Sequence, residues 1–367
     1  MVDKFKKIVV LDGRMTNPMG YDFESMLGEV ADEVRIYQTT EPHQIKRRCK
    51  GADAIVVGQS KIESQTLNCL AEDLKVIIAA STGYDYLNGC LDTAQQLGIH
   101  VCNVPDYCSD AVARYVFTSL DQALTSTSDL KYGWRKAGQE ILTAVALPLR
   151  ITNLTLGIVG LGRIGTKVAR MANVAHGMSN VVAYSPHWRD KELPEDVHVQ
   201  FMDSLEDVAV RSDVLTVHCK LNSQTDGLIS SRIIKRMKKG AILINTARQE
   251  IVDEEALVHA LLTNDLRAAV VDVTGENSKL KNVRNAIVTD HMAYADDVSL
   301  KQLLSGVLGN ARSYLSADPI NSVFQVSTSL DIKKARGGDY GKSLQPSLPA
   351  AMRGLNLGGA LQQFASV

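Results

Sequence analysis

The stretch that decides the fold of this chain is Leu156-Gly157-Ile158-Val159-Gly160-Leu161-Gly162-Arg163-Ile164-Gly165. An apolar run ends in the spacing G-x-G-x-x-G and leads into residues 166–175, which contain neither Gly nor Pro and predict a helix. Gly160 allows a tight turn from strand to helix, Gly162 lets the backbone approach a phosphate, and Gly165 lets the helix pack closely on the strand. The pyrophosphate of a dinucleotide would then lie at the helix N-terminus, where free N–H groups favour negative charge.

The rest of the chain alternates short apolar strands with helical segments in two series, which predicts parallel sheets covered by helices. Strands of the first series are expected at 8–12, 34–38, 54–58, 76–81 and 100–104. Strands of the second series are expected at 157–159, 181–184, 214–218, 241–245, 268–273 and 286–289. Residues 111–135 predict a long helix and a linker between the two series, and a last helix is expected at 299–315.

Composition and charge restrict the class of protein. The chain has 367 residues, enough for two domains, and it is 45% hydrophobic and 22% charged, which is typical of a soluble globular protein. Its formal net charge of −1 gives no electrostatic reason to bind nucleic acid or an anionic membrane, and no apolar run reaches membrane-spanning length. The cysteines lack C-x-x-C spacing, so we expect free thiols, no metal site and a cytoplasmic location.

Three segments of the second series carry candidate catalytic side chains. They are Asn245-Thr246-Ala247-Arg248, Asp272-Val273-Thr274-Gly275-Glu276 and Thr289-Asp290-His291. Each follows a predicted strand, and ligands of open parallel sheets bind at the carboxyl ends of the strands. Taken singly, a histidine is more often structural, and an arginine or glutamate more often forms a surface pair. Together, an arginine fork for a carboxylate and an imidazole for proton transfer are typical of a site that oxidises or reduces a hydroxy or keto acid.

The order of these motifs resembles the D-2-hydroxyacid dehydrogenase family. The glycine motif, the Arg248 segment, the acidic loop and the run from Thr289 to Tyr294 follow one another as in that family. In the first third, two stretches are similar to its substrate-domain loops: Ala80-Ser81-Thr82-Gly83-Tyr84-Asp85 and Val101-Cys102-Asn103-Val104-Pro105-Asp106-Tyr107. The match covers residues 5–325, and it is most similar to the glycerate dehydrogenase, or hydroxypyruvate reductase, branch through Leu11-Asp12-Gly13, Asn17-Pro18 and Tyr294.

The resemblance implies an α/β fold with two doubly wound parallel-sheet lobes and a cleft between them. A flavodoxin-like substrate domain would contain residues 1–121 and 293–326, and a Rossmann NAD(P)-binding domain would contain residues 122–292. A homodimer with its interface near residues 111–138 is also implied. Residues 327–367 are rich in Gly, Ser and Pro and have weak periodicity, so we expect a surface extension or a partner-binding tail.

The resemblance also implies a role for each candidate residue. Arg248 would hold the carboxylate and carbonyl oxygen of a small 2-keto acid, and His291 would protonate that oxygen as hydride arrives, with Glu276 as its carboxylate partner. Backbone N–H groups would share the carboxylate at Ser81, Thr82 and Gly83. The residues expected to bind the nicotinamide cofactor are Gly160, Gly162, Arg163, Ile164, Gly165, Ser185, Arg189, His218, Thr246, Ala247 and Asp272.

Four departures from the family pattern bear on these roles. The family reads D-V-x-x-x-E-P, whereas Glu276 comes one residue early and no proline follows it. Asp290 and Lys220 each replace a proline of the family, before His291 and after His218 respectively. The displacement of Glu276 leaves two alternatives: a short loop brings this acid to the imidazole of His291, or the pair is broken.

The fourth departure concerns the choice of cofactor. The family's acid at the end of the second cofactor strand, which bonds the ribose hydroxyls of NAD, is replaced by Ser185. Arg189, with His187, would instead accept a 2′-phosphate, so NADP is favoured over NAD. If Arg189 only faces solvent, NAD would still bind.

The leading hypothesis is a dehydrogenase that reduces a small 2-keto acid, hydroxypyruvate or glyoxylate first, to the D-2-hydroxy acid. The alternative is a dinucleotide-sensing scaffold with weak or no turnover, similar to the corepressor-like C-terminal-binding proteins. The displaced Glu276, the missing prolines and the basic tail favour the scaffold, whereas Arg248 and His291 favour catalysis. A third possibility keeps the fold but changes the substrate, as in formate or phosphite dehydrogenases.

Overall fold

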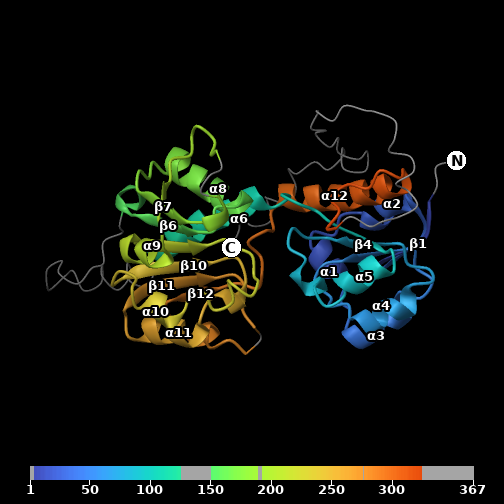
Figure 1. Ribbon diagram of the computed structural model, residues 1–367, viewed down its shortest axis with the longest axis horizontal. Helices are drawn as coiled ribbons and strands as arrows, with labels where there is room; N and C mark the ends of the chain where they lie inside the picture. The colour runs from blue at the N-terminus through green and yellow to red at the C-terminus, as the bar shows by residue number, and fades with distance from the viewer. Residues whose placement is uncertain (1–3, 125–149, 189–191, 276, 325–367) are drawn as a thin grey trace, which may run out of the picture. The chain divides into compact units, whose positions relative to one another are not determined.

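The structure is a computed structural model that describes residues 4–124, 150–188, 192–275 and 277–324. These residues form two compact units (Figure 1). The first contains the described residues up to Tyr107 together with those from Asp296 onward, and the second contains Cys108–Ala295. Among the helices in these ranges, none is both long and apolar enough to cross a membrane.

The first unit is built on a five-stranded parallel sheet in the order β2-β1-β3-β4-β5, which is the flavodoxin-like order. Its strands are β1 (Phe5–Val10), β2 (Ala31–Ile36), β3 (Ala54–Val57), β4 (Val76–Ala79) and β5 (His100–Asn103). Its helices are α1 (Gly13–Thr16), α2 (Phe23–Gly28), α3 (Pro42–Arg48), α4 (Ser64–Leu70), α5 (Leu91–Gln96) and α12 (Asp297–Leu315).

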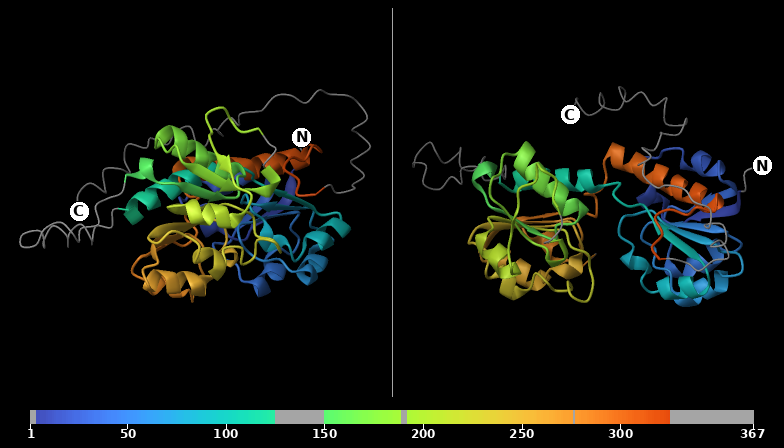
Figure 2. Two further views of the ribbon diagram at one scale, coloured as in Figure 1. Left: turned by 60° about the vertical axis from the view of Figure 1, so that its left-hand side comes forward. Right: turned by 45° about the horizontal axis from the view of Figure 1, so that its top comes forward.

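Helices cover both faces of this sheet, so every residue of β3 and β4 is buried. On one face, Ile55 and Ile77 pack with Ile45 of α3 and Leu67 of α4. On the other face, α12 contacts β4, β5 and α2. The right-hand view of Figure 2 shows this arrangement, with α12 in orange on the opposite side of the sheet from α3 and α4.

The second unit is built on a seven-stranded parallel sheet in the order β12-β11-β10-β9-β6-β7-β8. Counted from β6, this is the Rossmann order with β12 added at one edge. Its strands are β6 (Leu156–Val159), β7 (Val181–Tyr184), β8 (Gln200–Phe201), β9 (Val214–Val217), β10 (Ala241–Asn245), β11 (Leu266–Val271) and β12 (Ala286–Val288). Its described α-helices are α6 (Ser109–Leu124), α8 (Arg163–Arg170), α9 (Leu205–Arg211), α10 (Ser231–Ile234) and α11 (Glu254–Leu262).

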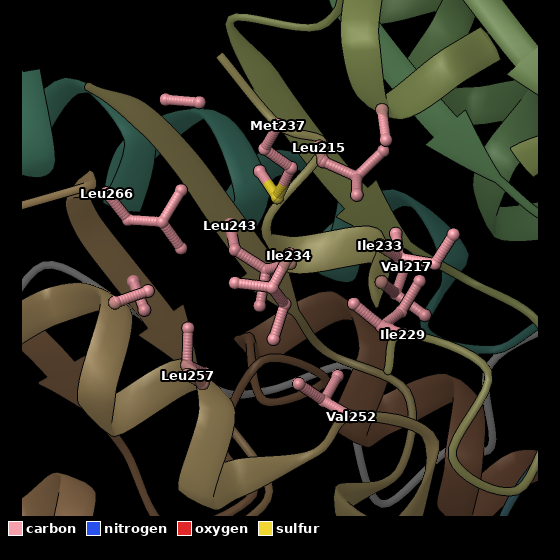
Figure 3. Close-up of a cluster of buried hydrophobic side chains, with 14 of the residues drawn as sticks. Leu215, Val217, Ile229, Ile233, Ile234, Met237, Leu243, Val252, Leu257 and Leu266 are labelled. Atoms are coloured by element: carbon pink, nitrogen blue, oxygen red, sulfur yellow. The ribbon is translucent and has the colours of Figure 1, made fainter. Parts of the chain in front are cut away.

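Alternate residues of each central strand enter two different cores, one on each face of this sheet. Leu243 packs with Ile233 of α10 and Leu257 of α11, and Figure 3 shows these side chains together. Ile242 and Ile244 point to the other face and pack against α6 and α8. The two parallel sheets confirm the predicted fold class, since each is covered by helices on both faces.

The structure differs from the expected elements in three places. The strand β8 was not predicted, because two residues are too few to show a period. The helix expected within 111–135 is described as α6, Ser109–Leu124, and residues 125–149 lie outside the described ranges. The first domain boundary, expected at 121, falls inside α6, and the whole helix groups with the second unit because Val116 and Leu120 pack in one core with Val168.

A buried carboxylate satisfies backbone groups at the carboxyl edge of the first sheet. Asp12 follows β1 and is 7% exposed. Its Oδ2 accepts hydrogen bonds from the N–H groups of Gly58, Gln59 and Ser60, which follow β3, at 2.9, 3.0 and 3.0 Å, and its Oδ1 accepts one from Ser60 Oγ at 2.6 Å. The carboxylate therefore ties together the loops after two neighbouring strands.

Replacing Asp12 should destabilise the first unit. Asp12→Ala leaves these N–H groups without their acceptor, so we expect the free energy of unfolding to fall by about 2–4 kcal/mol. Urea denaturation followed by circular dichroism measures the loss. The control is Asp22→Ala, which removes an exposed cap of α2 that accepts from Ser25 N at 3.1 Å and should cost about 1 kcal/mol or less. Equal losses in the two variants would contradict a bracing role for Asp12.

Candidate active site

The glycine loop between β6 and α8 is held by close backbone contacts. Gly160 has a φ of +93°, and a Cβ at this position would lie 2.7 Å from the backbone N of Cys219. The N–H of Gly160 donates to the carbonyl of Tyr184 at 2.9 Å. A Cβ at Gly165 would lie 2.2 Å from the carbonyl oxygen of Gly160. Both positions therefore require glycine, and together they turn the chain sharply from strand to helix.

The N-terminus of α8 fits a phosphate group. Gly162 caps the helix in an extended conformation, and outside its chain neighbours no described atom lies within 4 Å of the position of a Cβ there. In the first turn, the side chain of Arg163 is exposed and that of Ile164 is half-buried. Because the N–H groups of this turn and the helix dipole favour negative charge, the loop fits the pyrophosphate of a dinucleotide.

Ser185 follows β7 and contacts the glycine loop. Its side chain is buried, and its Oγ accepts a hydrogen bond from the N–H of Leu161 at 3.0 Å. The hydroxyl still has its own proton to donate. His187, two residues on, is exposed. Arg189, the other residue expected to choose the cofactor, lies outside the described residues.

His218 links the loops after β9 and β10. Its Nε2 lies 2.9 Å from Thr216 Oγ1, and its Nδ1 lies 3.4 Å from Thr246 Oγ1. Burial lowers the pKa of His218 to about 3, because the charged form would lose its hydration. The imidazole is therefore neutral at physiological pH, and it suits hydrogen bonding to hydroxyl groups better than binding a phosphate.

The loop that carries Arg248 is braced by Asn245, the last residue of β10. Asn245 is 1% exposed, its Oδ1 accepts from the N–H of Ala247 at 3.0 Å, and its Nδ2 donates to the carbonyl of Arg248 at 2.8 Å. Nη1 of Arg248 donates to the carbonyl of Ala247 at 2.7 Å. The sequence assigned roles to Thr246, Ala247 and Arg248 but none to Asn245, which is the end of an apolar strand in the sequence pattern.

The loop that carries His291 wraps around Asp272. Asp272 follows β11 and is 1% exposed, and its carboxylate accepts from Thr289 Oγ1 at 2.5 Å and from the N–H groups of Met292 and Ala293 at 2.7 and 2.9 Å. The carbonyl of Asp272 accepts from the N–H of His291 at 2.6 Å. Asp272 therefore holds the His291 loop, whereas the sequence assigned it to the cofactor, an assignment that stays a prediction.

His291 itself has an unusual backbone conformation. Its φ is +52°, a left-handed value that a residue other than glycine seldom adopts. Its ring meets the ring of Tyr294 edge to face, with the centroids 5.9 Å apart. Glu276, the expected carboxylate partner of His291, lies outside the described residues.

The expected substrate loop, residues 81–83, belongs to the first unit and follows β4. Its carbonyl groups are bound from within that unit: Ser81 accepts from the N–H of Val104 at 3.1 Å, Thr82 from Asn103 Nδ2 at 2.7 Å, and Gly83 from Ser81 Oγ at 2.6 Å. These bonds fix the orientation of the peptide groups in the loop. Asn103, to which the sequence assigned no role of its own, is the side chain that makes one of them.

The site residues of the second unit gather at one edge of its sheet. Arg248, Asp272 and His291 follow β10, β11 and β12, which are neighbours, and the glycine loop follows β6. Parallel strands end at the same edge, so the guanidinium of Arg248 and the imidazole of His291 are carried by loops at the edge that bears the glycine loop. A hollow of about 780 Å³, lined by residues such as Asn180, lies instead at the opposite edge, where β6, β7 and β8 begin.

The low pKa of His218 predicts an acid-sensitive fold. The unfolded chain binds a proton near pH 6.5 but the folded chain only near pH 3, so stability falls as the pH drops from about 6.5, by up to about 1.4 kcal/mol for each pH unit. His218→Gln should remove this part of the pH dependence. Urea titrations at pH 7, 6 and 5 measure it, with the exposed His259→Gln as the control. An unchanged slope in His218→Gln would show that His218 takes up no proton on unfolding.

Residues 116–293 match the model of the D-isomer specific 2-hydroxyacid dehydrogenase, NAD binding domain. The chain is 33% identical to D-3-phosphoglycerate dehydrogenase of Methanocaldococcus jannaschii over 78% of its own length and 54% of that protein, so it spans about half of that relative. It is 31% identical to glycerate dehydrogenase of Methylorubrum extorquens over 87% of its length and 99% of the relative.

The fold agrees with solved structures of the same kind. D-lactate dehydrogenase from Aquifex aeolicus, solved with NAD and lactic acid, superposes with a TM-score of 0.72 at 25% identity, over 86% of this chain and 98% of that one. The match of residues 116–293 contains the glycine loop, Arg248 and His291. With the sequence identity over nearly the whole of the M. extorquens relative, these findings show that the chain belongs to the D-isomer-specific 2-hydroxyacid dehydrogenase family.

Proposed function

We propose that this protein is a nicotinamide-dependent dehydrogenase that interconverts a small 2-keto acid and the corresponding D-2-hydroxy acid. The observation that carries the proposal is the pair Arg248 and His291. Each lies on a loop fixed by a buried polar side chain, Asn245 or Asp272, at the sheet edge that bears the glycine loop. A rigid cation and a rigid imidazole at that edge suit an anionic substrate whose carbonyl oxygen must gain a proton.

Arg248 is the proposed substrate anchor. Its guanidinium has five N–H donors in a planar fork, which binds a carboxylate through two parallel hydrogen bonds. One nitrogen, Nη1, donates to the carbonyl of Ala247 and so limits how the fork can rotate. Residues 81–83 are proposed to supply backbone N–H groups to the same carboxylate, which fits a loop whose carbonyl groups are already bound by other donors.

His291 is the proposed general acid in the reduction and the general base in the oxidation. An imidazole exchanges protons near neutral pH, and a neighbouring carboxylate would stabilise its charged form. Glu276 is the proposed carboxylate, although it comes one residue early by the family pattern. The edge-to-face contact with Tyr294 keeps the ring of His291 from turning freely.

The cofactor is proposed to be held by the glycine loop, the first turn of α8, Ser185, the His218–Thr246 pair and Ala247. When bound, the nicotinamide supplies the hydride. The protein positions the cofactor and the substrate and provides the charged groups around them. His218, being neutral, would offer a hydrogen bond without attracting the phosphates. Asp272 is proposed to lie near the amide end of the nicotinamide.

Hydroxypyruvate and glyoxylate are the proposed first substrates. The likeness to the M. extorquens glycerate dehydrogenase supports a short keto acid. We also propose a homodimer, in a cytoplasmic setting, with the interface near residues 111–138, half of which lie outside the described residues. The alternative function, a dinucleotide-sensing scaffold, would be supported by one result: tight cofactor binding with no turnover. The displaced Glu276 would then explain the missing turnover.

Removal of either proposed catalytic side chain should abolish turnover. We expect Arg248→Ala and His291→Ala each to lower kcat/KM for hydroxypyruvate by about a hundredfold to ten-thousandfold. The assay follows the loss of reduced-nicotinamide absorbance with hydroxypyruvate, glyoxylate and pyruvate. Controls are Arg211→Ala and His259→Ala, which remove exposed side chains of α9 and α11. If all four variants keep wild-type rates, the proposed site is wrong.

We further propose that NADP is preferred to NAD. Ser185 takes the place of the acid that would repel a 2′-phosphate, and exposed His187 follows it. In NADP sites a cation near this position binds the phosphate, and Arg189 is the proposed one.

Ser185→Asp should move this preference toward NADH. An aspartate there can still accept the N–H of Leu161, but its charge would repel the 2′-phosphate, so we expect the ratio of kcat/KM for NADPH to that for NADH to fall about tenfold or more. The control is Ser179→Asp, the same change at an exposed residue before β7. An unmoved ratio would mean that Ser185 does not face the ribose.

A further inference from the structure

We propose that Tyr115 and Thr289 are positioning residues for His291, acting through Asp272. This inference rests on the proposed function, because it concerns how the proton donor is held. Tyr115 Oη lies 2.5 Å from Thr289 Oγ1, and Thr289 Oγ1 lies 2.5 Å from Asp272 Oδ1. The three side chains form one continuous chain of hydrogen bonds that starts on α6 and ends at the loop of His291.

The direction of these hydrogen bonds is fixed by chemistry. An ionised carboxylate can only accept, so the hydroxyl proton of Thr289 goes to Asp272. Thr289 then has only lone pairs left for Tyr115, so the phenol must donate to it. Burial and the charge of Asp272 both raise the pKa of Tyr115, which keeps its proton in place at neutral pH.

The loop of His291 needs such a support. The N–H groups of three consecutive residues, 291–293, all point to Asp272: the first bonds its carbonyl, and the next two bond the two carboxylate oxygens. This nest of N–H groups encloses an acceptor of negative charge. The left-handed backbone of His291 costs about 1–2 kcal/mol relative to the right-handed form, so it persists only where contacts on both sides hold it.

Tyr115 connects this loop to a rigid part of the unit. It lies on α6, whose buried side chains share a core with those of α8, the helix that begins at the glycine loop. A second link joins the same two helices, an ion pair of 2.5 Å between Lys167 and Asp110. The His291 loop and the glycine loop are therefore both attached to the helix pair α6 and α8. This attachment keeps the imidazole of His291 at a fixed position relative to the proposed cofactor site.

The test removes single hydroxyl groups and keeps the shapes of the side chains. Thr289→Val deletes both hydrogen bonds, Thr289→Ser restores them, and Tyr115→Phe deletes only the outer one. The matched control is Ser119→Ala on α6, which removes a buried hydroxyl that donates only to backbone carbonyls of Tyr115 and Val116. Each variant is assayed for kcat, for the solvent isotope effect on kcat/KM, for the Kd of NADPH and NADH, and for Tm.

We expect Thr289→Val to lower kcat about tenfold or more and to increase the solvent isotope effect, because misplacement of a proton donor slows the proton transfer. Tyr115→Phe should lower kcat by about threefold, and Thr289→Ser should be close to wild type. The Kd of the cofactor should stay within about twofold, and Tm should fall no further than in Ser119→Ala.

Two results would overturn the inference, and they differ from failure of the proposed function. If wild type turns over and the Thr289 and Tyr115 variants lose no more activity than Ser119→Ala, the hydroxyl chain does not position His291. If Thr289→Val loses activity but Thr289→Ser does not recover it, the effect is one of packing. A wild-type protein without turnover would instead refute the proposed function, and the positioning role with it.

Discussion

Asp272 is the constraint on which the catalytic edge depends. A parallel sheet stops all its strands at one edge, where the connecting loops must satisfy their own N–H and C=O groups. The carboxylate of Asp272 takes two backbone N–H groups and one hydroxyl of the 289–293 segment, and its carbonyl takes a third N–H. A neutral side chain of the same size could not accept so many hydrogen bonds. Without these hydrogen bonds, nothing would hold residues 289–293 in one conformation.

The same solution occurs at other loops of the chain. Asp12 binds the backbone after β3 in the first unit, and Asn245 binds the backbone after β10 in the second. In each case a side chain at the end of a strand, buried beneath the loop, accepts or donates to peptide groups close by. Loops built in this way are held by hydrogen bonds to a buried side chain, so they can carry exposed polar side chains and still remain ordered.

The sequence predicted the two sheets because buried parallel strands such as β3 and β4 are continuous apolar runs, with helical segments between them. It also predicted the glycine loop, and it placed Arg248 and His291 just after two strands, as in the structure, while their roles stay predictions. It could not predict the bracing by Asn245, Asn103 and Tyr115, since hydrogen-bond partners that lie far apart in the chain leave no periodic signal. The expected boundary at 121 differs from the structure for the same reason, because the packing of α6 on α8 is a tertiary contact. Predictions for Arg189 and Glu276 stay predictions.

The crowding around the glycine loop has a consequence for how this sequence can diverge. At Gly160 and Gly165 the atoms that exclude a side chain belong to the backbone, of Cys219 and of Gly160 itself. No change of a neighbouring residue type can make room there. At Gly157 the obstructing atoms belong to the side chains of Ser212 and Val208, which substitution could shorten. A chain of this fold could therefore accept a larger residue at Gly157 if Ser212 and Val208 changed with it, whereas no such compensating change is open to Gly160 and Gly165.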